Sequence, residues 1–208
     1  MFRAITVSRE YGSGGGMIAR AVAEKLGWEL LDRALIAEVA RIVQVDAESV
    51  VRYDEHVDSW WHRLYRGGLL SFTLAAGIAP GDAQFCDAET MADFAKQVMI
   101  KAAERGGCVI VGRGAQCVLQ DYEDVLHVFI YAPWTERVRR VWTRAAPNGD
   151  IEELIRATDD ERARYIRLYY GCDWKDPHLY HMMLSSELGS EQVASMILEA
   201  VNAGVPAW

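Results

Sequence analysis

Residues 5–19, ITVSREYGSGGGMIA, run from a short apolar segment through a glycine-rich loop into the start of an amphipathic helix. This pattern predicts a buried strand at residues 4–7, a loop at 8–16 and a helix at 17–26. In such an arrangement the N–H groups of the loop and first helical turn converge on one point, where the helix dipole also favours negative charge. Glycines let a phosphate approach the backbone closely. The stretch therefore predicts a phosphate-binding loop, with a flexible glycine connector as the alternative. The predicted contacts are Gly12, Ser13, Gly14, Gly15 and Gly16.

The loop departs from the Walker A pattern, G-x-x-x-x-G-K-[ST]. If Gly14 is the last glycine of the motif, Arg9 stands at the first glycine position and Gly15 replaces the lysine. Gly16 and Met17 then offer no hydroxyl group for magnesium. Because Arg9 is the only basic side chain between residues 8 and 17, our hypothesis is that it supplies the missing cation.

A dinucleotide-binding fingerprint is the competing interpretation of the same loop. Residues 14–19 read G-x-G-x-x-A, and Asp32 lies near the distance expected for a ribose-binding acid. That fingerprint should begin almost directly after the strand, whereas residues 8–13 intervene here. A larger loop that curls around phosphates explains this spacing better.

The rest of the chain alternates strand and helix patterns, which favours an α/β fold with a mostly parallel sheet. Further strands are expected at 28–31, 108–111, 126–131 and about 181–184, and further helices at 135–144, 151–170 and 190–201. Capping boxes at residues 150–153 and 158–161 each indicate a helix start, although the second alternatively lies inside one longer helix. Residues 34–104 look mainly helical and are too long for a simple crossover. We therefore expect one domain over residues 1–208, with a core of 1–33 and 105–208 and an inserted helical lobe.

Composition excludes several classes of protein. With 208 residues, 51% hydrophobic and 25% charged, the chain is typical of one globular domain rather than a disordered protein. Its longest nearly apolar stretch, 69–79, is shorter than the ~20 residues of a membrane helix. The first residues lack the apolar region of a signal peptide. The four cysteines form no C-x-x-C pair, which is typical of reduced thiols. We expect a cytoplasmic protein with no membrane partner.

The charge pattern points to a small anionic ligand. A net charge of −8 would repel a nucleic acid polymer. Yet of 22 basic residues only four are lysines, which leaves 18 arginines, the better residue for binding phosphate through two parallel hydrogen bonds. Eight of the arginines lie within residues 137–167, where Arg140 and Arg144 share one helix face. Codon bias and a solvated surface are the alternatives.

Several segments together resemble the cytidylate kinase-like family, relatives of bacterial cytidylate kinase. The segments are SREYGSGG at 8–15, LLDR at 30–33, VIVGRG at 109–114, VLHVFIYAP at 125–133, TER at 135–137, RARY at 162–165, DW at 173–174, DP at 176–177 and Tyr180. They occur in the right order along nearly the whole chain, while residues 34–99 carry little of the resemblance. The resemblance implies a three-layer P-loop kinase-type fold with a parallel sheet, a helical acceptor lobe and an arginine-rich lid. It also implies transfer of the ATP γ-phosphate, with Mg²⁺, to a nucleoside monophosphate or related small acceptor.

Site residues follow from the matched segments. Arg113 ends a buried strand between two glycines, so its side chain should lie at the carboxyl edge of the sheet, where ligands bind. The resemblance assigns Arg113 to the phosphate of the acceptor, but Gly114 replaces the acidic residue that follows it in the family, which puts recognition of cytosine or ribose in doubt. Arg162 and Arg164 are predicted lid arginines. Asp32 is predicted to lie on the acceptor side and to assist magnesium, for which the sequence offers no dedicated cage of ligands.

Two other functions stay open at this point. Because the lysine, the hydroxyl and the acid are missing, the chain could be a catalytically weak or inactive nucleotide-binding protein with a regulatory or assembly role. The fingerprint at 14–19 leaves a nicotinamide-dependent oxidoreductase as the third. An aromatic cluster at 60–65 fits a helical core, a base pocket or a homodimer interface.

Overall fold

The computed structural model describes residues 1–32, 88–144 and 150–204 of the chain. The chain divides into two compact units, one of Met1–Arg33 with Lys96–Trp208 and one of Ala34–Ala95. Most of the predicted helical lobe, including the aromatic cluster at 60–65, lies outside the described residues. Its described end belongs to helix α6 (Ala88–Arg105).

Five parallel strands form the sheet of the described chain, in the order β2-β3-β1-β4-β5. The strands are β1 (Ala4–Arg9), β2 (Glu29–Leu31), β3 (Cys108–Val111), β4 (Val125–Tyr131) and β5 (Met182–Ser185). The three central strands are nearly continuous runs of buried residues, as expected of parallel strands that are covered on both faces. The predicted α/β fold with a parallel sheet is confirmed.

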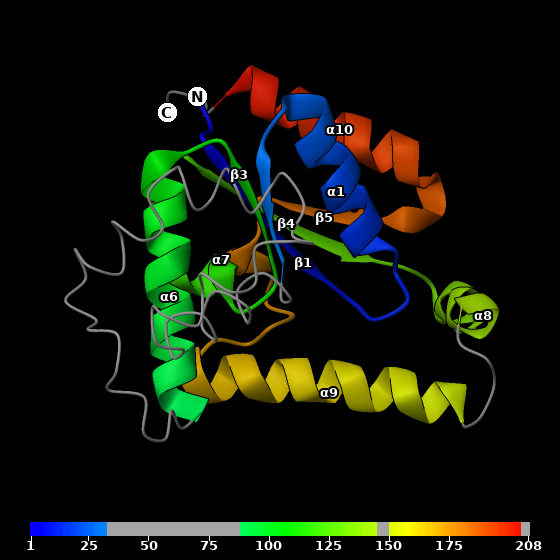
Figure 1. The fold of residues 1–208 in the computed structure, drawn as a ribbon. Helices are drawn as coiled ribbons and strands as arrows, with labels where there is room; N and C mark the ends of the chain where they lie inside the picture. The colour runs from blue at the N-terminus through cyan, green and yellow to red at the C-terminus, as the bar shows by residue number, and fades with distance from the viewer. Residues whose placement is uncertain (33–87, 145–149, 205–208) are drawn as a thin grey trace, which may run out of the picture. The chain divides into compact units, whose positions relative to one another are not determined.

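Helices cover both faces of this sheet (Figure 1). On one face α1 (Gly15–Leu26) and α10 (Ser190–Ala203) lie side by side and pack Ile18, Val22 and Ile197 against the strands. On the other face α7 (Ala115–Val118) and α9 (Ile151–Tyr170) contribute Cys117 and Ile166 to a second cluster around Phe129. The remaining elements of the described residues are α8 (Trp134–Arg144) and the short 3-10 helices η2 (Pro177–Leu179) and η3 (Ser186–Leu188).

Helix α9 begins where the first capping box predicts. The Asp150 side chain accepts hydrogen bonds from the N–H groups of Glu152 and Glu153, and the helix then continues to Tyr170 without interruption. Of the two interpretations of 158–161, one longer helix is confirmed, because Thr158 lies inside α9 and its hydroxyl donates to the Leu154 carbonyl. The unbroken helix can therefore carry Asp159, Arg162 and Tyr165 as one rigid row, since residues three apart share a face.

The parallel arrangement brings the ends of distant segments together. The carboxyl ends of parallel strands lie at one edge of a sheet, which is where ligands bind in open α/β folds. At this edge, β1 leads into the glycine loop, β2 into Asp32, and β3 into residues 112–114. β4 leads into α8, and β5 into η3.

Candidate functional site

The loop between β1 and α1 is a tight turn that exposes backbone N–H groups. Ser13 closes it, because its N–H and its hydroxyl both donate to the Glu10 carbonyl, at 3.3 and 2.8 Å. Gly12 and Gly14 both have φ near +80°, a conformation that favours glycine. Within the described residues, the N–H groups of Gly12, Gly14 and Gly16 donate to no acceptor. A Cβ at Gly16 would meet no atom within 4 Å, so space for an anion is open beside the N-terminus of α1.

Ser13 differs from the other predicted contacts. It is fully buried, its hydroxyl also accepts the Gly15 N–H at 3.3 Å, and its carbonyl accepts from Arg140 and Ser186. All of these groups form hydrogen bonds within the protein, so Ser13 shapes the loop and does not offer its side chain to a ligand.

A buried ion network fixes the loop from behind. Arg137, which is only 5% exposed, donates from Nε to the Tyr11 carbonyl at 2.7 Å and pairs with Asp159. It also lies 3.3 Å from a carboxylate oxygen of Glu10. Asp159 in turn accepts the Tyr11 N–H at 2.8 Å, so both backbone groups of Tyr11 are held by α8 and α9. Although Arg137 belongs to the arginine-rich segment 137–167, its contacts are all with the protein itself.

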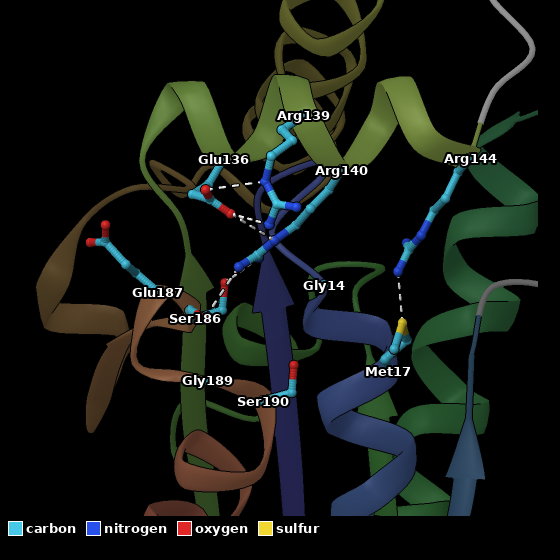
Figure 2. A pocket seen from close by; sticks show the side chains of 10 residues that line it. All are labelled: Gly14, Met17, Glu136, Arg139, Arg140, Arg144, Ser186, Glu187, Gly189 and Ser190. Atoms are coloured by element: carbon cyan, nitrogen blue, oxygen red, sulfur yellow. Dashed lines mark hydrogen bonds and ion pairs between the residues drawn. The ribbon is translucent and has the colours of Figure 1, made fainter.

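A cavity of about 430 Å³ lies beside the N-terminus of α1 (Figure 2). Its lining residues are Gly14, Met17, Glu136, Arg139, Arg140, Arg144, Ser186, Glu187, Gly189 and Ser190. Arg140 and Arg144 both line it, as their shared helix face predicts. Arg140 donates to the Ser13 carbonyl at 2.8 Å and to the Ser186 hydroxyl at 2.7 Å, and thereby joins α8, the loop and η3. No motif in residues 186–190 indicates their place in this cavity.

The predicted site arginines that do not line this cavity, Arg9 and Arg113, lie at the ends of β1 and β3. The Arg9 side chain starts beside Gly15, where a Cβ would lie 2.6 Å from the Arg9 Cβ, and its guanidinium group lies against Gly112. Arg162 donates to the Arg9 carbonyl at 2.9 Å. Arg113 follows at the end of β3, with its guanidinium 5.8 Å from the centre of the Tyr165 ring. Arg9 thus extends from the phosphate loop to the strand end that carries Arg113.

The last two predicted site residues are Asp32 and Arg164. Asp32 is half-buried and follows β2, the strand beside β3, so it lies at the same edge as Arg113. Arg164 is exposed, and its spacing of two residues from Arg162 places it on a different face of α9. Residues that sequence analysis missed are Gln116, on the helix that follows Arg113, and Tyr170, whose ring packs on Gly114; both carry buried polar atoms.

The residues at this edge of the sheet fit a phosphate-bearing cofactor. The open glycine loop and the arginine-lined cavity suit a nucleotide. Over the part of the chain that is described, no group of three or more His, Cys, Asp or Glu side chains could hold a metal ion. Among the same residues, no helix combines the length and the apolar character that crossing a membrane requires.

A parallel α/β sheet with a phosphate-type loop after its first strand defines a P-loop kinase-type fold, and solved structures agree. The chain superposes on an uncharacterized protein from Eubacterium ventriosum with a TM-score of 0.68, at 20% identity, over 96% of this chain and 98% of that one. It superposes on shikimate kinase from Acinetobacter baumannii in complex with shikimate with a TM-score of 0.50, at 17% identity, over 98% and 94%.

Sequence comparison identifies the family. Residues 4–188 match the cytidylate kinase-like family, and the chain belongs to it. It is 29% identical to a cytidylate kinase from Pseudomonas syringae pv. tomato over 95% of this chain and 94% of that protein. It is also 29% identical to a cytidylate kinase from Methanosarcina mazei over 48% of this chain, and it spans 57% of the length of that relative. The resemblance stated from the sequence is confirmed, and family and fold support a nucleotide kinase function.

Proposed function

We propose that the protein is an ATP-dependent phosphotransferase that acts on a nucleoside monophosphate or a related small acceptor. One observation carries this proposal: the open N-terminus of α1 is flanked by two separate arginine-bearing regions. Arg140 and Arg144 lie on the α8 side, and Arg9 and Arg113 on the β3 side. A transfer reaction needs such a division, because donor and acceptor must approach one phosphoryl group from opposite directions.

On the donor side, the phosphates of ATP would lie against the N–H groups of Gly12, Gly14 and Gly16. The base and ribose would then occupy the cavity of about 430 Å³ that begins at Gly14 and Met17. Arg144 extends across this cavity to the Met17 sulfur, and both side chains would have to accommodate the nucleotide (Figure 2). Ser13 and Arg137 hold the loop in its binding conformation.

On the acceptor side, Arg113 would hold an anionic group of the acceptor and Asp32 would lie beside it. Arg9 lies between the loop and Arg113, the position from which a cation can neutralise charge on the transferred group. Arg162 holds the Arg9 backbone, and Arg164 would join only through a change in its side-chain conformation. Magnesium, when bound with ATP, would supply further charge neutralisation, held by phosphate oxygens, water and Asp32.

The test is a coupled assay of ADP release with ATP and a panel of acceptors that includes CMP, the other nucleoside monophosphates and the corresponding nucleosides. We expect ADP release that depends on one class of acceptor. Arg9→Ala should lower turnover strongly, whereas Arg20→Ala, which removes an exposed arginine of α1, should leave it unchanged. ATP binding without turnover on any acceptor would instead support an inactive nucleotide-binding protein, the second candidate, which the absent lysine favours.

A further inference from the structure

Four buried polar side-chain atoms lack a hydrogen-bond partner within the described residues, and they come from two short segments. They are Arg113 Nε, Gln116 Nε2, Tyr165 Oη and Tyr170 Oη. Folded proteins satisfy the large majority of their buried polar groups, so each exception calls for an explanation. Here the exceptions are concentrated in the turn after β3 and the C-terminal half of α9, which indicates one shared cause.

Contacts between these two segments bring the side chains of Arg113, Tyr165 and Tyr170 together. The Arg113 guanidinium lies 5.8 Å from the centre of the Tyr165 ring, and the Tyr165 and Tyr170 rings are 6.0 Å apart in an edge-on arrangement. The Tyr170 ring packs on Gly114, where a Cβ would overlap its edge. Gln116 follows on α7 and is only 1% exposed, with its Oε1 accepting from the Ser8 hydroxyl at 2.9 Å.

The amide of Gln116 cannot be satisfied by turning it over. In the orientation described, Ser8 donates to Oε1 and Nε2 has no acceptor. With the amide reversed, Nε2 could donate to the Ser8 hydroxyl, but Oε1 would then lose its donor. One end of a nearly inaccessible side chain therefore lacks a partner in either case.

The chemistry of the cluster selects an oxyanion. Each of the four groups can donate a hydrogen bond, and Arg113 adds a positive charge that forms no ion pair with any carboxylate of the described chain. Burial, and then the neighbouring Tyr165 hydroxyl, raise the pKa of Tyr170 above its ordinary value, even though the nearby Arg113 charge lowers it, so the phenol stays protonated and able to donate. Arg113 is also the only non-glycine residue of the described chain with positive φ, at 57°, a conformation often retained at ligand-binding positions.

We propose that Arg113, Tyr165 and Tyr170 form the pocket for the oxyanion of the acceptor, a phosphate monoester or a carboxylate, with the two tyrosines as specificity-determining residues. This inference rests on the proposed function for the identity of the acceptor. The pocket itself rests only on the unpaired buried donors and their contacts. It assigns to Tyr165 and Tyr170 a role in binding that neither the loop nor the arginines supply.

The experiment compares Tyr165→Phe and Tyr170→Phe with Tyr169→Phe, a neighbouring tyrosine of α9 whose hydroxyl is not among the unpaired buried atoms. Calorimetric titrations with CMP, cytidine, inorganic phosphate, acetate and ATP measure affinity. Because a hydrogen bond to a charged group is lost, we expect each of the first two variants to weaken oxyanion binding about tenfold or more. Tyr169→Phe should leave it unchanged, and none of the three should alter ATP affinity. Binding of phosphate and CMP without acetate would identify a phosphate monoester, and the reverse a carboxylate.

Urea unfolding of the same variants separates this role from a structural one. Removing an unpaired buried hydroxyl should leave the urea midpoint unchanged or raise it. A lowered midpoint together with unchanged anion affinity would show that the hydroxyls hold structural water, and the proposal would be overturned.

The two proposals fail differently. If the protein shows no phosphotransfer but binds the anion, and the Phe variants lose that binding, the pocket is supported and the kinase function is not. If both variants catalyse phosphotransfer with an unchanged KM for the acceptor, the proposal of the pocket is overturned and the kinase function is supported.

Discussion

Arg137 and Arg113 are the same residue type at the same edge of the sheet, yet their surroundings are opposite. Arg137 is buried with Glu10, Asp159 and the Tyr11 carbonyl, so the chain itself supplies its partners. Arg113 has a buried Nε without a partner among the described residues and an unusual backbone conformation. An arginine whose partners come from the protein holds the fold, whereas one with unmatched donors is prepared for a ligand. Replacing Arg137 should therefore affect stability, and replacing Arg113 should affect activity.

The largest effect on stability is expected for Arg137→Met. Removing the buried cation of this network leaves Asp159 to the longer contact with Arg162 and Glu10 to the exposed Lys175, so the free energy of unfolding should fall by about 3–5 kcal/mol. Urea unfolding followed by circular dichroism measures the loss. The matched control is Arg139→Met, which breaks an exposed pair with Glu136 on the same helix and should leave the midpoint unchanged. Equal midpoints for the two variants would show that the buried network stabilises nothing.

Arg113→Met should show the reverse behaviour. Because no described carboxylate pairs with Arg113, the free energy of unfolding should stay within about 1 kcal/mol of the native value. Phosphotransfer should fall about 10²–10³-fold, the usual cost of removing one group that stabilises charge in the reaction. Initial rates of ADP release measure this effect, with the exposed Arg167→Met of α9 as control. A large loss of stability with normal turnover would place Arg113 in the same class as Arg137.

His127 extends the comparison to a group whose partners require the neutral form. Its Nδ1 accepts from the Thr6 hydroxyl at 2.7 Å, and its Nε2 lies 3.2 Å from the Leu119 carbonyl. Burial, and then the neighbouring His181, lower the pKa of His127 to about 4 from the ordinary 6.5. Between pH 6.5 and pH 4 the imidazole is protonated in the unfolded chain but neutral in the folded protein. The contribution of His127 to the free energy of unfolding is therefore full above pH 6.5 and decreases as the pH falls towards 4.

The loss should reach roughly 3 kcal/mol at most. Urea unfolding at intervals between pH 7.5 and 4, with an NMR titration of His127, measures it. His178→Gln, which replaces an exposed imidazole, is the control and should leave the profile unchanged. A stability profile that is flat from pH 6.5 to 5 would contradict the assignment.

The sequence predicts the fold well because buried parallel strands are nearly continuous apolar runs. β3 begins and ends where expected, but β1 continues two residues further, since Ser8 and Arg9 pair with Phe129 and Ile130 of β4. Polar residues at the end of a strand look like loop in the sequence, and only the neighbouring strand shows otherwise.

The candidate site was predictable where position along a strand decides it. Asp32 and Arg113 follow strands whose ends share one edge, so their placement follows from topology alone. Which arginines have protein partners was not predictable, because the burial of Arg137 depends on its ion pairs with Asp159, 22 residues later, and with Glu10. Nor can a sequence show that the Gln116 amide is buried without a second partner.

The smallest effect concerns two adjacent glycines of the loop. Gly15→Ala should destabilise the protein by about 1–3 kcal/mol, because the added Cβ would lie 2.6 Å from the Arg9 Cβ. Gly16→Ala meets no atom within 4 Å and lies in the first turn of α1, so it should stabilise the protein by about 0.5–1 kcal/mol. If phosphates occupy that open space, the same methyl group should weaken ATP binding, which titration calorimetry measures. Gain of stability with loss of affinity in one variant is the behaviour of a residue kept small for a ligand. A Gly16→Ala protein that is more stable and binds ATP normally would place the phosphates elsewhere on the loop, and would leave Gly15 as the residue that packing alone requires.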